Sequence, residues 1–168
     1  MNKVFRNIFS SCYKKLHEAY QKENYYNYRK KFSGINPDFI FNGEAIKIYG
    51  NGEIFLVANF YIGSYSTTQL THGTKVSVGH DTATSHNVRI YTSNRNPADV
   101  IFEKDLTGIK QGDVIIGNYC WIGSNVFICQ GVKIGDYTVI GANSVVSKDI
   151  PSNCIAAGSP IRILKNKS

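Results

Sequence analysis

Three of the four histidines in this sequence, His72, His80 and His86, lie within one short segment of the chain. Histidine is the side chain best suited to accept a proton at neutral pH, because its ordinary pKa is about 6.5. Arg95 follows this segment, and its guanidinium group stays charged near pH 7, so it cannot act as a base. The three histidines are therefore the candidate general bases of the chain.

Two other kinds of chemistry are not expected. The four cysteines include no CxxC pair, and a buried thiol acting as a small hydrophobe is the simpler interpretation of Cys120. A covalent cysteine mechanism is disfavoured, because Cys120 faces inward and the other cysteines lack an obvious histidine partner. No group of histidines and carboxylates has the spacing of metal ligands, so no metal is expected.

These candidates must be positioned by a repeat with a period of six residues. Reading every sixth residue gives an unbroken aliphatic series: Ile116, Ile122, Ile128, Ile134, Ile140 and Val146. A period of six fits neither an α-helix nor a simple strand. It is typical of a parallel β-helix, in which short strands and tight corners wind around stacked aliphatic side chains. Glycine follows four of the six, where we expect it to ease the bend of the backbone.

The repeat also predicts the domain boundaries. A β-helical domain is expected over residues 46–168, with about 151–168 capping the open end of the last coil. The spacing from Ile90 to Ile116 is not a multiple of six, so a loop must leave the β-helix between them. We expect this loop at about 94–113, and a projecting loop of this kind is usually functional.

Residues 1–33 precede the β-helical domain and predict an amphipathic helix. Its apolar stripe comprises Val4, Phe5, Ile8, Phe9, Cys12, Tyr13, Leu16 and Tyr20. Residues 1–32 hold eight Lys or Arg against Glu18 and Glu23, a balance of +6, which leaves eleven bases and ten acids elsewhere. The simpler expectation is that the stripe packs on the β-helix or on a neighbouring subunit. Contact with an anionic membrane surface is the alternative.

Composition and charge exclude other classes of function. Nearly all the excess positive charge lies in the N-terminal segment, so a nucleic-acid-binding groove across the folded body is not expected. No apolar run approaches the length of a membrane span, and no secretory pattern is present. A cytoplasmic location is therefore expected.

Four runs of sequence carry a resemblance to a known family, at residues 112–124, 131–135, 140–151 and 157–160. Within them, Trp-Ile-Gly-Ser at 121–124 and Val-Val-Ser-Lys-Asp-Ile-Pro at 145–151 are the most specific motifs. The sequence closely resembles the left-handed β-helix (hexapeptide-repeat) acyltransferases, nearest to the maltose, galactoside and surface-polysaccharide O-acetyltransferases. The resemblance implies a homotrimer that binds acetyl-CoA in the groove between adjacent subunits and acts on a carbohydrate.

The resemblance also implies site residues. Those matching the cofactor contacts of the family are Trp121, Ser124, Ala142, Ser147, Lys148, Arg162 and Lys165. The chemistry agrees, because a pantetheine arm needs a narrow groove with small residues and backbone donors, and the phosphates of the cofactor need cations such as Lys148 and Lys165.

The acceptor side departs from the family pattern. In the maltose and galactoside branch a histidine follows a segment resembling 90–94, and here that position is Arg95. We rank His86 first as the base, because it occupies an outward position of its repeat. His80 occupies a corner where a turn residue is the better interpretation, and His72 ranks behind. Asp81 or a backbone carbonyl is expected to orient His86.

Arg95 and the preceding Asn94 are the candidate acceptor-binding residues, with Arg95 suited to a carboxylate of an acidic sugar. The predicted reaction is direct acetyl transfer in a ternary complex, in which a histidine removes the proton and backbone N–H groups stabilise the oxyanion. Two alternatives stay open. One is an N-acetyltransferase of a nucleotide-linked amino sugar, and the other is a non-catalytic β-helix that acts as a scaffold or binding module.

Overall fold

The computed structural model describes residues 3–166, so the ends of the predicted helical segment and of the predicted cap, 1–2 and 167–168, lie outside the described residues. The chain divides into two compact units, Met1–Phe32 and Ser33–Ser168. Over its described residues, the first unit consists of helix α1 (Lys3–Lys31). The second unit carries every β-strand of the described chain.

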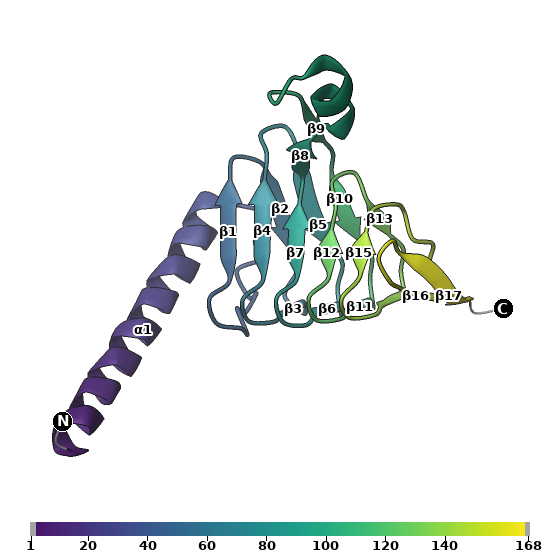
Figure 1. Cartoon of the computed structure of the whole chain (residues 1–168). Helices are drawn as coiled ribbons and strands as arrows, with labels where there is room; N and C mark the ends of the chain where they lie inside the picture. The colour runs from purple at the N-terminus through teal and green to yellow at the C-terminus, as the bar shows by residue number, and fades with distance from the viewer. Residues whose placement is uncertain (1–2, 167–168) are drawn as a thin grey trace. The chain divides into compact units, whose positions relative to one another are not determined.

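The second unit is a left-handed parallel β-helix, as predicted, and its coils wind through three sheets (Figure 1). The β1 sheet has the order β1-β4-β7-β12-β15, formed by Lys47–Gly50, Thr67–Leu70, Arg89–Tyr91, Phe127–Ile128 and Val145–Val146. The β2 sheet has the order β13-β10-β5-β2, formed by Lys133–Ile134, Val114–Ile116, Lys75–Val78 and Glu53–Leu56. The β3 sheet has the order β17-β16-β14-β11-β6-β3, formed by Arg162–Asn166, Cys154–Ala157, Val139–Ile140, Trp121–Ile122, Ala83–Thr84 and Tyr61–Ile62.

The core of the β-helix follows the six-residue period. Each of the six aliphatic side chains in the predicted series is at most 2% exposed. The positions four residues further on, from Cys120 to Ile150, are buried as well. Burying one such aliphatic side chain contributes about 1.5–3 kcal/mol, so the repeated stack is the main stabilising feature of the unit.

The glycines of the repeat serve close packing rather than the bend itself. A Cβ at Gly123 would lie 2.6 Å from the backbone nitrogen of Ala142 on the next coil, so no larger residue fits there. The left-handed backbone at the corners belongs instead to other residues, such as Tyr119 (φ 53°) and Asn125 (φ 59°). Our expectation that glycine eases the bend was therefore wrong at Gly123, where the constraint is the approach of the neighbouring coil.

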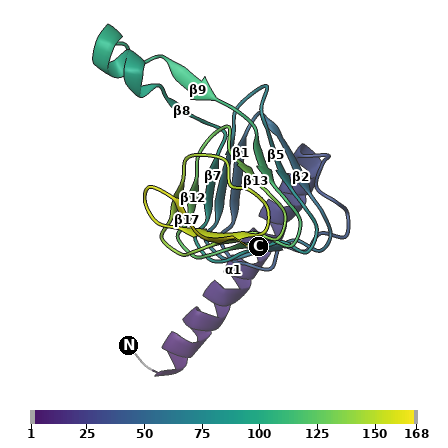
Figure 2. The same cartoon turned by 90° about the vertical axis from the view of Figure 1, so that its right-hand side faces the viewer.

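A hairpin leaves the β-helix after β7. It comprises strand β8 (Ser93–Arg95), a π-helical turn η1 (Asp99–Glu103) and strand β9 (Ile109–Gln111), and β8 and β9 pair antiparallel. Figure 2 shows the coils nearly end-on, with β8 and β9 extending away from them. At the other end of the chain, β16 and β17 pair antiparallel at the edge of the β3 sheet.

Helix α1 has exposed apolar side chains. Phe5, Phe9 and Leu16 are 72%, 73% and 71% exposed, respectively. The last turn of the helix carries Arg29, Lys30 and Lys31. Among the described residues, no helix combines the length and apolar character needed to cross a membrane.

Candidate functional site

One edge of the β-helix gathers three of the predicted site residues. Strands β3, β6, β11 and β14 pair in register, so the residues that follow them occupy equivalent positions on successive coils. The positions two residues beyond these strands form what we call the His86 edge: Ser64, His86, Ser124 and Ala142. The structure therefore places the predicted base on the coil next to the predicted cofactor contact Ser124.

The His86 edge is held rigid by contacts between coils. The side-chain oxygens of Ser85 and Ser124 lie 2.7 Å apart. Beside them, the Asn87 amide donates to Asn125 Oδ1 at 2.8 Å, and the Asn125 amide donates to Asn143 Oδ1 at 3.1 Å. All three asparagines have positive φ, a conformation in which asparagine is enriched. This ladder fixes the spacing of the coils at the point where the site residues stand.

The hydrogen bond of His86 determines its tautomer. The backbone N–H of Ser64 donates to His86 Nδ1 at 3.2 Å. Because Nδ1 is the acceptor, the proton of the neutral ring lies on Nε2. The prediction that Asp81 or a backbone carbonyl orients His86 was wrong, since a backbone N–H does so. In this tautomer His86 is a hydrogen-bond donor through Nε2.

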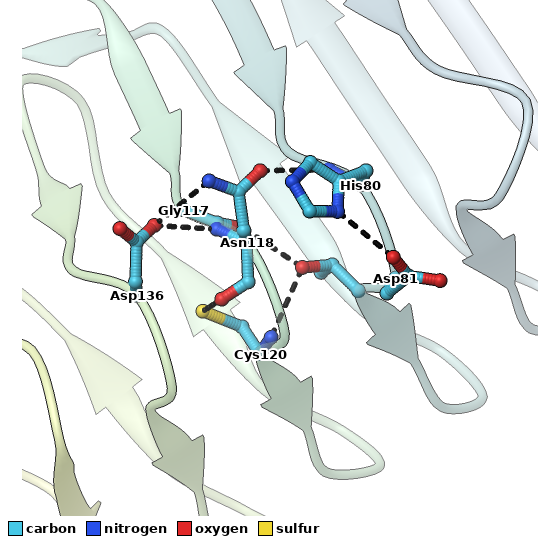
Figure 3. Close-up of polar contacts among 7 residues, drawn as sticks. His80, Asp81, Gly117, Asn118, Cys120 and Asp136 are labelled. Carbon is cyan, nitrogen blue, oxygen red and sulfur yellow. Dashed lines mark hydrogen bonds and ion pairs between the residues drawn. The ribbon is translucent and has the colours of Figure 1, made fainter.

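A second histidine has the opposite tautomer. Nδ1 of His80 lies 2.8 Å from Asp81 Oδ2 (Figure 3). An ionised carboxylate only accepts hydrogen bonds, so Nδ1 of His80 is the donor and Nε2 of the neutral ring keeps its lone pair. A histidine oriented in this way can accept a proton at Nε2. His80 is therefore equipped as a base, although the sequence ranked it behind His86 and favoured a turn residue at this position.

His80 stands on a different edge, where the β2 sheet meets the β3 sheet. We call this the His80 edge, formed by His80, Asn118 and Asp136 on successive coils. Asn118 Oδ1 accepts the backbone N–H of His80 at 3.0 Å, and Asp136 Oδ1 accepts the backbone N–H of Asn118 at 2.7 Å (Figure 3). The His80 ring lies edge-on to Tyr119, with ring centroids 5.1 Å apart. These contacts position the His80–Asp81 pair.

Cys120 lies inside the His80 edge and is 2% exposed. Its thiol lies 3.1 Å from the carbonyl oxygen of Gly135, and its backbone N–H donates to Thr82 Oγ1 at 3.0 Å. Burial raises the pKa of the Cys120 thiol above its ordinary value, because the thiolate would lose its hydration. The side chain is a packed thiol.

Trp121 belongs to an outward-facing row on the β3 sheet. It pairs with Ala83 on one side and Val139 on the other, and its side chain is 59% exposed. Further along the row, a cavity of about 280 Å³ is lined by Val139, Ile155, Lys165 and their neighbours. Lys165 enters this row because β17 pairs with β16, which brings Lys165 opposite Ile155. The Trp121 ring and the Lys165 cation thus lie on the same face of the β3 sheet.

The remaining residues that the sequence predicted to bind the cofactor lie on other parts of the β-helix. Ser147 and Lys148 directly follow β15 and are exposed. Asn143 and the His86 edge precede β15, so Ser147 and Lys148 lie at the opposite end of this strand. Arg162, opposite Ala157, is exposed on β17. Within one chain, the predicted cofactor residues are thus divided between two edges of the β1 sheet and the face of the β3 sheet.

The predicted acceptor residues lie in the projecting hairpin. Asn94 and Arg95 belong to β8 and are exposed. Arg95 Nη1 donates to the carbonyl oxygen of Leu106 at 2.6 Å, which ties the two sides of the hairpin together. In the same hairpin, Ile101, Phe102 and Leu106 have exposed apolar side chains. The hairpin therefore carries a cation held by a hydrogen bond as well as exposed apolar groups.

Two features escaped the sequence reasoning. The contact of His80 with Asp81 could have been predicted, because the two residues are adjacent in the sequence and neighbouring residues at a corner can contact each other directly. The contact of Ser85 with Ser124 had no such signal, since 39 positions separate them along the chain. Over the described residues, no cluster of histidine, cysteine and carboxylate groups has the arrangement of a metal site.

Comparison with known proteins matches this arrangement to one family. Residues 113–148 match the model described as "Bacterial transferase hexapeptide (six repeats)". The chain is 36% identical over 138 residues to the putative acetyltransferase YJL218W of Saccharomyces cerevisiae, covering 82% of this chain and 67% of that protein. It is 31% identical over 130 residues to the putative lipopolysaccharide biosynthesis O-acetyl transferase WbbJ of Escherichia coli, covering 73% and 65%. The chain thus spans about two thirds of the length of these two relatives.

Solved structures share the fold. A maltose O-acetyltransferase from Clostridium difficile 630 superposes with a TM-score of 0.63 at 28% identity, covering 99% of this chain and 90% of that one. A hexapeptide-repeat acetyltransferase from Vibrio cholerae, VCA0836, complexed with acetyl coenzyme A, has a TM-score of 0.58 at 26% identity, covering 88% and 78%.

Proposed function

The chain belongs to the hexapeptide-repeat acyltransferase family, and we propose that it transfers an acetyl group from acetyl-CoA to a hydroxyl of a carbohydrate. The observation that carries this proposal is the His86 edge, where a histidine, a serine and an alanine stand in line on successive coils. A surface polysaccharide or its precursor is the proposed acceptor, because the relative WbbJ is named for lipopolysaccharide biosynthesis.

Acetyl-CoA fits the residues along this edge. Small side chains at Ser124 and Ala142 leave room for a narrow pantetheine arm, and backbone groups at the corners can hydrogen-bond to its amides. Lys148 and Lys165 are exposed cations suited to the phosphates of the cofactor. The related structure VCA0836 is a complex with acetyl coenzyme A, which supports the same donor here.

The proposed reaction is direct transfer. The acceptor hydroxyl oxygen attacks the acetyl carbonyl carbon while a histidine removes its proton, because a neutral hydroxyl is a weak nucleophile. Backbone N–H groups stabilise the oxyanion of the tetrahedral intermediate. The carbon–sulfur bond then breaks, and the proton passes from the histidine to the departing thiolate, giving the acetyl ester and CoA.

His86 is the proposed base, because it stands beside Ser124. Accepting a proton at Nε2 requires the ring to carry its other proton on Nδ1, so the bond from the Ser64 N–H must break when substrates bind. His80 is the competing base. Its contact with Asp81 already provides the required tautomer, but it stands on another edge.

A site shared between copies of the chain accounts for the division of the cofactor residues. Ser124 and Lys148 stand on different edges of one chain, and a trimer in which two edges meet would unite them. The exposed apolar side chains of the hairpin, such as Ile101 and Phe102, suit contact with a neighbouring subunit. We therefore propose a homotrimer with its sites between subunits, as in the family.

Arg95 is proposed to bind an acidic acceptor. One nitrogen of its guanidinium group is held by the Leu106 carbonyl, which fixes the orientation of the remaining donors. Those donors suit the carboxylate of a sialic or uronic acid. The replacement Arg95→Ala should raise KM for acidic sugars and leave neutral sugars unchanged. Loss of activity on both classes with unchanged KM would contradict this role.

The test of the function measures acetylated product by mass spectrometry over a panel of neutral, acidic and amino sugars. Mass detection is preferable to thiol reagents, because the chain has free cysteines of its own. We expect ester formation on a sugar hydroxyl. Preferential amide formation on an amino sugar would identify an N-acetyltransferase, and acetyl-CoA binding without turnover on any sugar would identify a binding module.

Histidine variants identify the base. We expect His86→Ala to lower kcat by about 10²- to 10⁴-fold, the usual contribution of a general base. His72→Ala is the matched control, and it should retain full activity. His86→Gln keeps a hydrogen-bond donor but cannot take up a proton. Full activity in His86→Gln would refute the base role, and a loss confined to His80→Ala would assign the base to His80.

A further inference from the structure

Helix α1 has an apolar face that is exposed along most of its length. Successive residues of a helix differ in direction by about 100°, so Phe5, Phe9 and Leu16 fall within about 40° of one another. Each is more than two thirds exposed, and Ile8, Tyr13 and Tyr20 beside them are 58%, 65% and 63% exposed. An exposed apolar face of this size indicates a partner surface.

The opposite face of α1 is cationic. Lys3, Lys14 and Lys22 lie on the side of the helix away from Leu16, and all three are exposed. Residues 1–32 carry eight bases against two acids, Glu18 and Glu23, whereas the rest of the chain is close to neutral. A partner that matches both faces of the helix must offer apolar groups together with negative charge.

A second copy of the helix does not meet that need. It carries the same net positive charge, so pairing two helices brings no attraction between opposite charges. A two-stranded seam is narrow and favours branched aliphatic residues, whereas this face is wide and dominated by Phe and Tyr. Aromatic side chains are instead well suited to the boundary between lipid headgroups and acyl chains.

We propose that α1 binds the surface of an anionic lipid bilayer and lies in the plane of its headgroups. Phe5, Phe9 and Leu16 would enter the acyl boundary, and the lysines would contact the negatively charged headgroups. The helix lies on the bilayer rather than crossing it, since no described helix is suited to span a membrane. This function of the chain is independent of its acetyl transfer.

The test is sedimentation of the full-length protein with vesicles. We expect binding to vesicles of phosphatidylglycerol mixed with phosphatidylcholine, no binding to pure phosphatidylcholine, and weakening of the binding as salt is raised. Lys14→Glu combined with Lys22→Glu should lower the partition coefficient at least tenfold. The matched charge control is Lys104→Glu combined with Lys110→Glu in the hairpin, which should change binding little. Absence of binding to the anionic vesicles, or equal losses in the two double variants, would overturn the proposal.

A second pair of variants tests the apolar face. Leu16→Gln should weaken vesicle binding about tenfold or more, since burying a leucine side chain is worth a factor of that order. Leu164→Gln is the control, because Leu164 is similarly exposed, at 66%, but lies on β17. Circular dichroism and light scattering verify helix content and oligomer mass. Equal binding of the two variants, or a change of oligomer mass in Leu16→Gln without loss of vesicle binding, would show that the face contacts another subunit.

Discussion

Thr92 holds the projecting hairpin to the β-helix, and its replacement by valine is the most direct test of how the proposed acceptor site is positioned. Thr92 is fully buried, at 0% exposed. Its Oγ1 accepts the backbone N–H of Thr71 at 2.8 Å and the hydroxyl of Thr74 at 2.7 Å. The backbone carbonyl of Thr92 accepts the N–H of Gly112 at 2.9 Å, where the chain returns from the hairpin.

The expected cost of Thr92→Val follows from these contacts. Valine matches the shape of threonine, so the change removes hydrogen bonds without opening a large cavity. The Thr74 hydroxyl can still donate its one proton to the Thr71 carbonyl oxygen, which lies 2.7 Å away, but the Thr71 N–H loses its acceptor. Leaving one buried donor unsatisfied costs about 1–3 kcal/mol. We therefore expect a loss of about 2 kcal/mol, or a fall in Tm of about 4–8 °C for a chain of this size.

The assay is thermal unfolding at fixed protein concentration, because Tm depends on concentration in an oligomer. Thr67→Val is the matched control, since Thr67 lies on β4 with its side chain facing outward and should tolerate the same change within about 0.5 kcal/mol. If the hairpin positions Arg95, Thr92→Val should also raise KM for the acidic acceptor and leave KM for acetyl-CoA unchanged. Equal Tm values for the two variants would refute the reasoning.

Further predictions concern the core, the thiols and the cofactor. Ile128→Ala should destabilise the β-helix by about 2–5 kcal/mol in urea unfolding, because it leaves a cavity at a fully buried position. Maleimide should label one thiol rapidly at neutral pH, and Cys12→Ser should abolish that phase, since Cys12 is exposed whereas burial raises the pKa of Cys120 and Cys129. Acetyl-CoA should change the fluorescence of the single tryptophan, and Trp121→Ala should raise KM for acetyl-CoA without changing KM for the sugar.

The fold could be predicted from the sequence because the β-helix repeats one constraint many times. Ile116 and each sixth residue after it must point inward on every coil, so a single pattern specifies both the strands and the core. The role of Gly123 was not predicted correctly. The six-residue period shows that a small residue occurs at this position, but it does not show that the backbone of Ala142 on the next coil lies against it. Contacts between coils depend on which residues lie opposite each other on neighbouring coils, and the spacing of residues in the sequence gives only indirect information about this.

The site was less predictable for the same physical reason. His86 and Ser124 are neighbours on adjacent coils, yet the hairpin lies between them in the sequence and hides the six-residue relation. The partner of His86 was equally hidden, since the Ser64 N–H comes from the preceding coil. The contact of His80 with Asp81 was the exception, because both residues lie at one corner.

The sequence resemblance implied a histidine at the position of Arg95, and this difference has a consequence for the proposed mechanism. A base in the hairpin would move with the hairpin, whereas His86 and His80 stand on stacked coils whose positions are fixed by hydrogen bonds. In the proposed function, the hairpin recognises the acceptor and a histidine of the β-helix takes up the proton. Variants that loosen the hairpin should therefore change KM for the sugar, while the pH dependence of kcat, which reports the base, stays the same. A shift of that pH dependence in Thr92→Val would place the base in the hairpin and contradict this division.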